Sequence, residues 1–254
     1  MLERAFAEAF ATQGIVPGTA AYAHYMVGVH QAQGQAAVDV FRGLFPEGDG
    51  RAEAAALSFE RSFRAAVDRT GISPVPGAEE AIRGLSESGM RVCLITSLPR
   101  RLLGLALDTL GWWRLADLTL CPEDVPRGCP WPDLMLAAML RLGVEDIRAA
   151  AFAGSTASEI QCAKRAGAGV VAGVLTGGHT GDRLRTAGAT HLIDGIAQLP
   201  GLVGSSAARP IGPAAGSPAA ASGEPAVPPP APASAASTAV ARPQVPLERR
   251  NSGL

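Results

Sequence analysis

Short hydroxyl side chains directly follow two apolar runs of the sequence, and they are the first candidates for chemistry. Thr96 and Ser97 end the run RVCLITS, and Gly154-Ser155-Thr156 follow the run AAAFA. If both runs are parallel strands, these residues lie at the carboxyl ends, where doubly wound sheets bind ligands. Backbone amides near Gly154, at the start of a helix, can also bind an anion weakly. The sequence therefore predicts a ligand site between residues 96–97 and 154–156.

Two further side chains add chemistry to that region. Glu159 and Ser155 are candidate oxygen ligands for a weak metal site, although a glutamate without a carboxylate partner seldom holds a metal. Glu159 also lies in the first turn after a Ser/Thr cap, where a carboxylate favours the helix.

Cys129 would be a nucleophile only if a cation or a helix N-terminus lowered the pKa of its thiol. Arg127 is near in sequence but no paired histidine is evident, so we do not expect thiol catalysis.

Strands and helices alternate from about Pro74 onward, and this pattern positions the candidate residues. Each helix is stopped by a glycine or a turn, which is typical of an α/β protein with a doubly wound parallel sheet. The expected strands cover residues 91–96, 118–121, 149–153, 169–174 and 191–193, and the helices between them cover residues 78–87, 102–110, 132–142, 156–166 and 180–187.

The first seventy residues lack strand alternation and show helical spacing of apolar residues instead. Helices are expected over residues 2–13, 19–30, 36–44 and 51–69, a unit of the size of a cap. From Ser205 to Leu254 there is no aromatic residue, and Pro, Ala, Ser and Gly dominate, which indicates a disordered tail. The expected organisation is a helical cap over 1–74, an α/β core over 75–204 and a tail over 205–254.

Composition excludes several classes of protein. The chain of 254 residues has a net charge of −1 and 5% aromatic residues, which argues against a nucleic-acid partner. No apolar run reaches the roughly 18 residues of a membrane span, and the N-terminus MLERAFAEAF has no signal-peptide core. We therefore expect a cytoplasmic protein without a membrane partner. The four cysteines are scattered and form no CxxC pair, so neither a zinc site nor a disulfide framework is expected.

Longer stretches of the sequence are similar to a known family. Several segments between residues 75 and 194 resemble the phosphonatase-like branch of the haloacid-dehalogenase (HAD) superfamily. They are VPGA at residues 75–78, VCLITS, LGWWRLADLTLCPEDV, GCPWPD, AGST, RAGAGVVAGVLTGGHT and ATHLID. The resemblance runs from Leu2 to about Leu199. It implies a Rossmann-like core with a helical cap, and Mg²⁺-dependent hydrolysis of phosphate or phosphonate compounds through an aspartyl intermediate.

Several positions that carry the family's chemistry differ in this sequence. The resemblance implies a nucleophilic Asp on a loop after a first strand, and the sequence begins inside the helix that should follow that loop. Thr96, Ser97 and Gly154 match phosphate-binding positions, although Ser97 is equally consistent with an ordinary capping serine. Cys129 stands where the resemblance implies a cation, Ser155 replaces the first metal-binding Asp, and Glu159 replaces the second.

These differences predict a HAD homologue that is inactive or strongly impaired. A small phosphorylated or phosphonate ligand, or a protein partner, remains compatible with such a fold. One alternative is an active Mg²⁺-dependent phosphatase or phosphonate hydrolase whose true N-terminus lies upstream. Another is a non-enzymatic binding or interaction protein that acts through its tail. Because a first strand is missing, we also expect an open groove beside the strand that ends at Thr96, and with it a tendency to form a homodimer.

Overall fold

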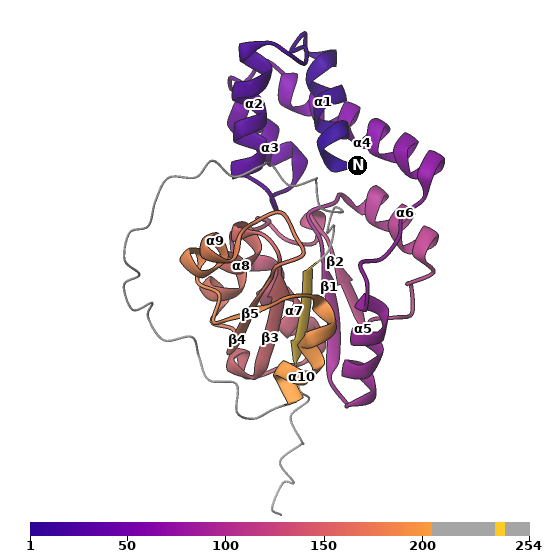
Figure 1. The fold of residues 1–254 in the computed structure, drawn as a ribbon, viewed down its shortest axis with the longest axis vertical. Helices are drawn as coiled ribbons and strands as arrows, with labels where there is room; N and C mark the ends of the chain where they lie inside the picture. Colours follow the sequence, from indigo (N-terminus) through magenta and orange to yellow (C-terminus); the bar gives the residue numbers. More distant parts are fainter. Residues whose placement is uncertain (205–236, 242–254) are drawn as a thin grey trace, which may run out of the picture.

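The computed structural model describes residues 1–204 and 237–241. Its first four helices form the part of the molecule that we call the cap (Figure 1). They are α1 (Leu2–Thr12), α2 (Ala20–Gln31), α3 (Ala37–Leu44) and α4 (Arg51–Thr70). No helix in these described ranges is long and apolar enough to cross a bilayer.

Phenylalanine side chains at helical spacing hold the cap together. Phe6 and Phe10 lie on one face of α1 and pack against Phe41 of α3 and Phe59 of α4, with ring centroids 4.7 Å apart for Phe6 and Phe59. Such pairs are favourable beyond the apolar area that they bury. Leu102, at the start of α6 (Arg100–Leu110), belongs to the same cluster. The cap therefore packs on the first turns of a core helix.

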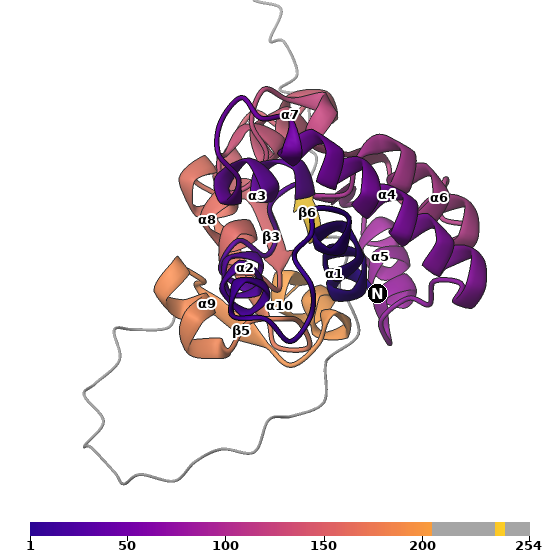
Figure 2. The ribbon, with the colours of Figure 1, turned by 90° about the horizontal axis from the view of Figure 1, so that it is seen from above.

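The core is a six-stranded sheet with helices on both faces (Figures 1 and 2). The strand order is β2-β1-β6-β3-β4-β5, and every strand except β6 runs parallel to the others. The parallel strands are β1 (Arg91–Ile95), β2 (Leu118–Leu120), β3 (Ala150–Gly154), β4 (Val170–Val174) and β5 (His191–Ile193).

The central strands are apolar along most of their length because both of their faces are covered. On one face lie α5 (Ala78–Glu87) and α10 (Leu199–Gly204), and on the other α7 (Asp133–Leu142), α8 (Ala157–Ala166) and α9 (Gly181–Ala187). Short 3₁₀ turns η1 (Pro122–Asp124), η2 (Ile147–Ala149) and η3 (Ile196–Gln198) complete the connections. The expected Rossmann-like α/β class is confirmed, whereas the domain boundaries remain predictions.

The strand β6 (Ser237–Ala241) corrects two expectations. It lies between β1 and β3, antiparallel to both, with Ala239 opposite Cys93 on one side and Phe152 on the other. The expected open groove beside β1 is therefore filled, and these five residues of the predicted tail form a strand. The reason is that two strands with unpaired backbone groups stabilise any extended segment that fits between them. Residues 205–236 and 242–254 of that predicted tail lie outside the described residues.

Candidate functional site

A cavity of about 390 Å³ lies at the carboxyl ends of β1, β3 and β4. Thr96, Gly154 and Ser155, three residues that the sequence singled out, all line it, together with Thr238 of β6. Thr96 is buried, and its hydroxyl accepts a hydrogen bond from the Leu98 N–H at 3.1 Å. Each parallel strand ends at this edge of the sheet, which explains why residues distant in sequence meet here.

A second and much smaller hollow lies beside it. Its lining includes Thr96, Ser97, Cys129 and Glu159, which come from the three sequence segments that resemble the family's motifs. The hollow measures about 10 Å³, which is no more than the space that one water molecule requires. The structure therefore brings the candidate phosphate, cation and metal positions together, but around a space that is almost closed.

Glu159 caps the helix that begins at this site. Its Oε2 accepts hydrogen bonds from the backbone N–H groups of Ser155 and Thr156, at 2.8 and 3.0 Å. In return, the Glu159 N–H donates to the Thr156 hydroxyl at 3.3 Å, which completes a capping box. The two amides at the start of α8 that would face an incoming anion are thus already bound to a carboxylate.

His179 satisfies the next backbone amide of α8 and joins the core to the cap. The Ala157 N–H donates to His179 Nδ1 at 2.8 Å, so the imidazole proton is on Nε2, which faces the His30 carbonyl oxygen at 3.4 Å. Burial, and then the positive charge of Arg183, lower the pKa of His179. The sequence indicates a structural role for His179 but does not identify its partners, because they lie 22 and 149 residues away.

Cys129 is neither a cation nor an activated nucleophile. It is 8% exposed, and the neighbouring Cys162 thiol and burial raise its pKa well above the ordinary value. A neutral thiol at this position attacks poorly and neutralises no phosphate charge. Arg127, the nearby cation in sequence, instead holds Asp133 through two hydrogen bonds of 3.1 and 3.0 Å.

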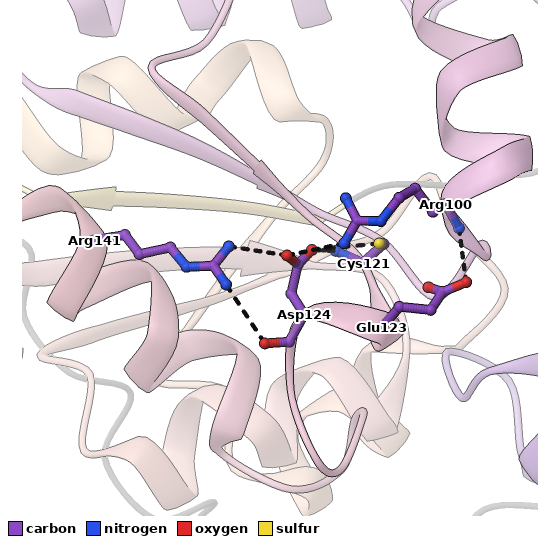
Figure 3. A network of polar contacts seen from close by, with 5 residues as sticks. All are labelled: Arg100, Cys121, Glu123, Asp124 and Arg141. Carbon is purple, nitrogen blue, oxygen red and sulfur yellow. Dashed lines mark hydrogen bonds and ion pairs between the residues drawn. The ribbon is translucent and has the colours of Figure 1, made fainter.

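Asp124, which sequence reasoning also missed, is the last residue of the turn η1 that follows β2 (Figure 3). Its Oδ1 lies 2.9 Å from Arg100 Nη2 and 3.0 Å from Arg141 Nη1, and its Oδ2 accepts the Cys121 N–H at 3.0 Å. Burial alone would raise the pKa of Asp124, but these hydrogen bonds outweigh it and hold the pKa well below its usual range. The carboxylate thus ties together the starts of α6 and η1 and the end of α7.

The residues at the site do not fit Mg²⁺, which the resemblance implies. Mg²⁺ requires hard oxygen ligands in near-octahedral geometry, usually including carboxylates. Glu159 is bound to backbone amides, and Ser155 offers a neutral hydroxyl. Across residues 1–204 and 237–241, no group of three His, Cys, Asp or Glu side chains is placed to hold a metal ion.

Comparison with solved structures shows the same fold. A hydrolase from Pseudomonas syringae aligns with a TM-score of 0.67 and 22% identity, over 80% of this chain and 90% of that one. A phosphonoacetaldehyde hydrolase-like protein from Oleispira antarctica aligns with a TM-score of 0.59 and 21% identity, over 80% and 84% of the two chains.

Sequence comparison extends the likeness to the family. A probable phosphatase, IndB, from Dickeya dadantii strain 3937 is 31% identical over 157 residues, which are 61% of this chain and 67% of the relative. Phosphonoacetaldehyde hydrolase from Bordetella pertussis is 30% identical over 150 residues, which are 50% of this chain and 54% of that protein. The chain thus spans about half to two thirds of these relatives. Residues 2–167 match the model of the haloacid dehalogenase-like hydrolases, and the chain belongs to that family and is similar to its phosphonatase-like members.

Proposed function

We propose that the residues of this chain do not by themselves hydrolyse phosphate or phosphonate compounds, and that the protein binds a ligand rather than turning it over. The observation that carries this proposal is the 10 Å³ hollow where the motif residues converge. A phosphoryl group is several times larger than the one water that such a space accepts.

Charge supports the same proposal. The hollow is lined by a carboxylate, Glu159, and by a buried neutral thiol, Cys129, and no Lys or Arg is among the residues that line it in the described chain. Phosphoryl transfer depends on cations that stabilise the charge spreading over the equatorial oxygens. A phosphate at this place would instead meet a negative group that already holds the amides of Ser155 and Thr156.

The test is release of inorganic phosphate from p-nitrophenyl phosphate and from phosphonoacetaldehyde by the purified full chain with Mg²⁺. We expect no release above the rate without protein. The double variant Cys129→Arg, Ser155→Asp should also release none, because the carboxylate that it adds stands at a metal-ligand position of the family and not at the position of the attacking Asp. Turnover by the unmodified chain that is abolished by EDTA and by Glu159→Ala would disprove the proposal.

The second candidate is an active hydrolase that is longer than this chain. The observation in its favour is that the relatives named phosphatase or phosphonoacetaldehyde hydrolase are longer than the part matched here. An additional strand could occupy the place of β6 between β1 and β3. The discriminating observation is the DNA upstream: an in-frame strand followed by an Asp-containing loop, expressed with this chain, should confer phosphate release.

The cytoplasmic location and the homodimer also remain proposals. The groove that motivated the homodimer is filled by β6, so that particular reason no longer holds. Size-exclusion chromatography with light scattering at several protein concentrations measures the oligomeric state directly.

A further inference from the structure

The cavity of about 390 Å³ differs in character from the small hollow beside it. Its walls are the ends of β1, β3 and β4, the inner sides of α5 and α6, and the chain that leaves the cap. Most of its lining is aliphatic or aromatic, with Leu94, Leu98, Leu107 and Trp112 among the larger side chains. A volume in this range is typical of small-molecule sites, which are mostly apolar with a few placed polar groups.

Ser155 is the polar group best placed to meet a ligand. The residue is 4% exposed and lines the cavity. Its backbone N–H is bound to Glu159, but its hydroxyl makes no hydrogen bond to any residue in the described part of the chain. Gly177 lies so close behind it that a Cβ there would collide with the Ser155 side chain. A hydroxyl that lines a cavity and has no partner in the described chain is available to bond to a ligand atom.

The only charged group that the described lining residues bring to the cavity is the α-ammonium group of Met1, a residue that is 39% exposed. None of the described residues that line it has an ionisable side chain. The Glu159 carboxylate lies close to the cavity, since it is bound at 2.8 Å to the N–H of the lining residue Ser155. An anionic group deep inside the cavity would lose its hydration with no Lys or Arg side chain to compensate, and the nearby Glu159 carboxylate would repel it.

We infer that this cavity binds a neutral, mainly apolar small molecule, with one hydrogen-bonding group that meets the Ser155 hydroxyl. The inference deepens the proposed function, since it takes the motif site to be closed to phosphate and assigns binding to the neighbouring space. The ligand class therefore differs from the phosphorylated or phosphonate compounds expected from the sequence.

The probes are 1-naphthol and 1-naphthyl phosphate, which share one ring system and differ in charge. Equilibrium dialysis against the full chain at pH 7 should show saturable binding of 1-naphthol and at least about tenfold weaker binding of the phosphate ester. Equal or tighter binding of the ester would overturn the inference. Release of naphthol from the ester would instead disprove the proposed function, so the two failures are distinguishable.

Two variants locate the binding. Ala106→Phe on α6 places a ring in the cavity and should abolish 1-naphthol binding, whereas Ala65→Phe on the exposed side of α4 should leave it unchanged. Circular dichroism and thermal melting check that both variants fold. Unchanged binding by a folded Ala106→Phe protein would refute the location.

Ser155→Ala tests the hydrogen bond and remains informative if Ala106→Phe does not fold. It should weaken 1-naphthol binding by about three- to tenfold, the usual effect of one neutral hydrogen bond. Binding of 1-methylnaphthalene, which has no hydrogen-bonding group, should stay the same. An equal change for both probes, or no change for either, would refute the role of Ser155.

Discussion

At the scale of single residues, His179 makes the stability of the fold depend on pH. Its Nδ1 accepts the Ala157 N–H at 2.8 Å, which requires a neutral ring, and burial lowers its pKa. Above the unfolded value of about 6.5 neither state binds the proton. As the pH falls below that value, the unfolded chain takes up a proton that the folded protein binds less readily, so the free energy of unfolding decreases.

Replacing this imidazole with a group that does not titrate should remove that part of the pH dependence. His179→Asn keeps a short acceptor for the Ala157 N–H, so it should lose less stability than the wild type between pH 7.5 and 5.5. Urea unfolding at several pH values measures the difference. His24→Asn, at an exposed position of α2, controls for the loss of one imidazole. Parallel pH profiles for wild type and His179→Asn would contradict the assignment.

Local residue roles were predictable where the partners are close in sequence. Glu159 as a helix cap follows from its position three residues after Thr156, and the structure shows the corresponding hydrogen bonds. The role of Asp124 depends on Arg100 and Arg141, which lie 24 residues before it and 17 after it, on other helices. No spacing in the sequence signals such a contact, because it forms only when the sheet brings the elements together.

At the scale of elements, the parallel strands were predictable and β6 was not. Each parallel strand is an apolar run bounded by glycine or turn residues, which is the usual pattern of a strand buried on both faces. The segment STAVA stands in a stretch rich in Pro and Ala and has no such pattern. It becomes a strand because β1 and β3 offer it two rows of backbone partners.

Removing β6 should therefore destabilise the sheet. A chain that ends at residue 204 leaves the facing edges of β1 and β3 without partners, and we expect it to lose at least about 3 kcal/mol of stability and to aggregate. A chain that ends at residue 241 keeps β6 and is the matched control. Urea unfolding and light scattering measure both effects.

A point variant tests the same strand without shortening the chain. Ala239 is fully buried in the core cluster, so Ala239→Asp places an unpaired carboxylate there and should lower stability to a similar degree.

The comparison of the two shortened chains can contradict this role of β6. If the chain that ends at residue 204 were as stable as the one that ends at 241, β6 would not contribute to the folded protein.

At the scale of the whole molecule, the end of α2 and the loop after it join the cap to the end of the sheet where the cavity lies. Arg183 of α9 donates to the Gln31 carbonyl oxygen at 3.2 Å, beside the contact between His179 and His30. Gly34, in the loop between α2 and α3, lies against Thr156 at the start of α8. The cap therefore contacts the capping box that Glu159 completes, so its position and the geometry of the site are linked.

Gly34 allows a direct test of that link. Its φ is +86°, and a Cβ there would collide with the Thr156 hydroxyl, whereas Gly14, with φ +77°, has open space around it. Both Gly→Ala changes carry the conformational cost of a left-handed backbone, roughly 1 kcal/mol. Only Gly34→Ala must also displace Thr156, so it should lose about 1 kcal/mol more than Gly14→Ala.

Thr156→Ala isolates the contact, because it removes the hydroxyl that the new Cβ would meet. In that background the effect of Gly34→Ala should shrink toward that of Gly14→Ala, although the Cβ atoms of residues 156 and 158 still lie 3.1 and 3.3 Å from the new Cβ. Urea unfolding of the four proteins in the cycle measures the coupling. An effect of Gly34→Ala that stays the same with and without the Thr156 hydroxyl would show that this hydroxyl does not hold the cap on α8. In that case its helices would be held to the core by the packing around Leu102 instead.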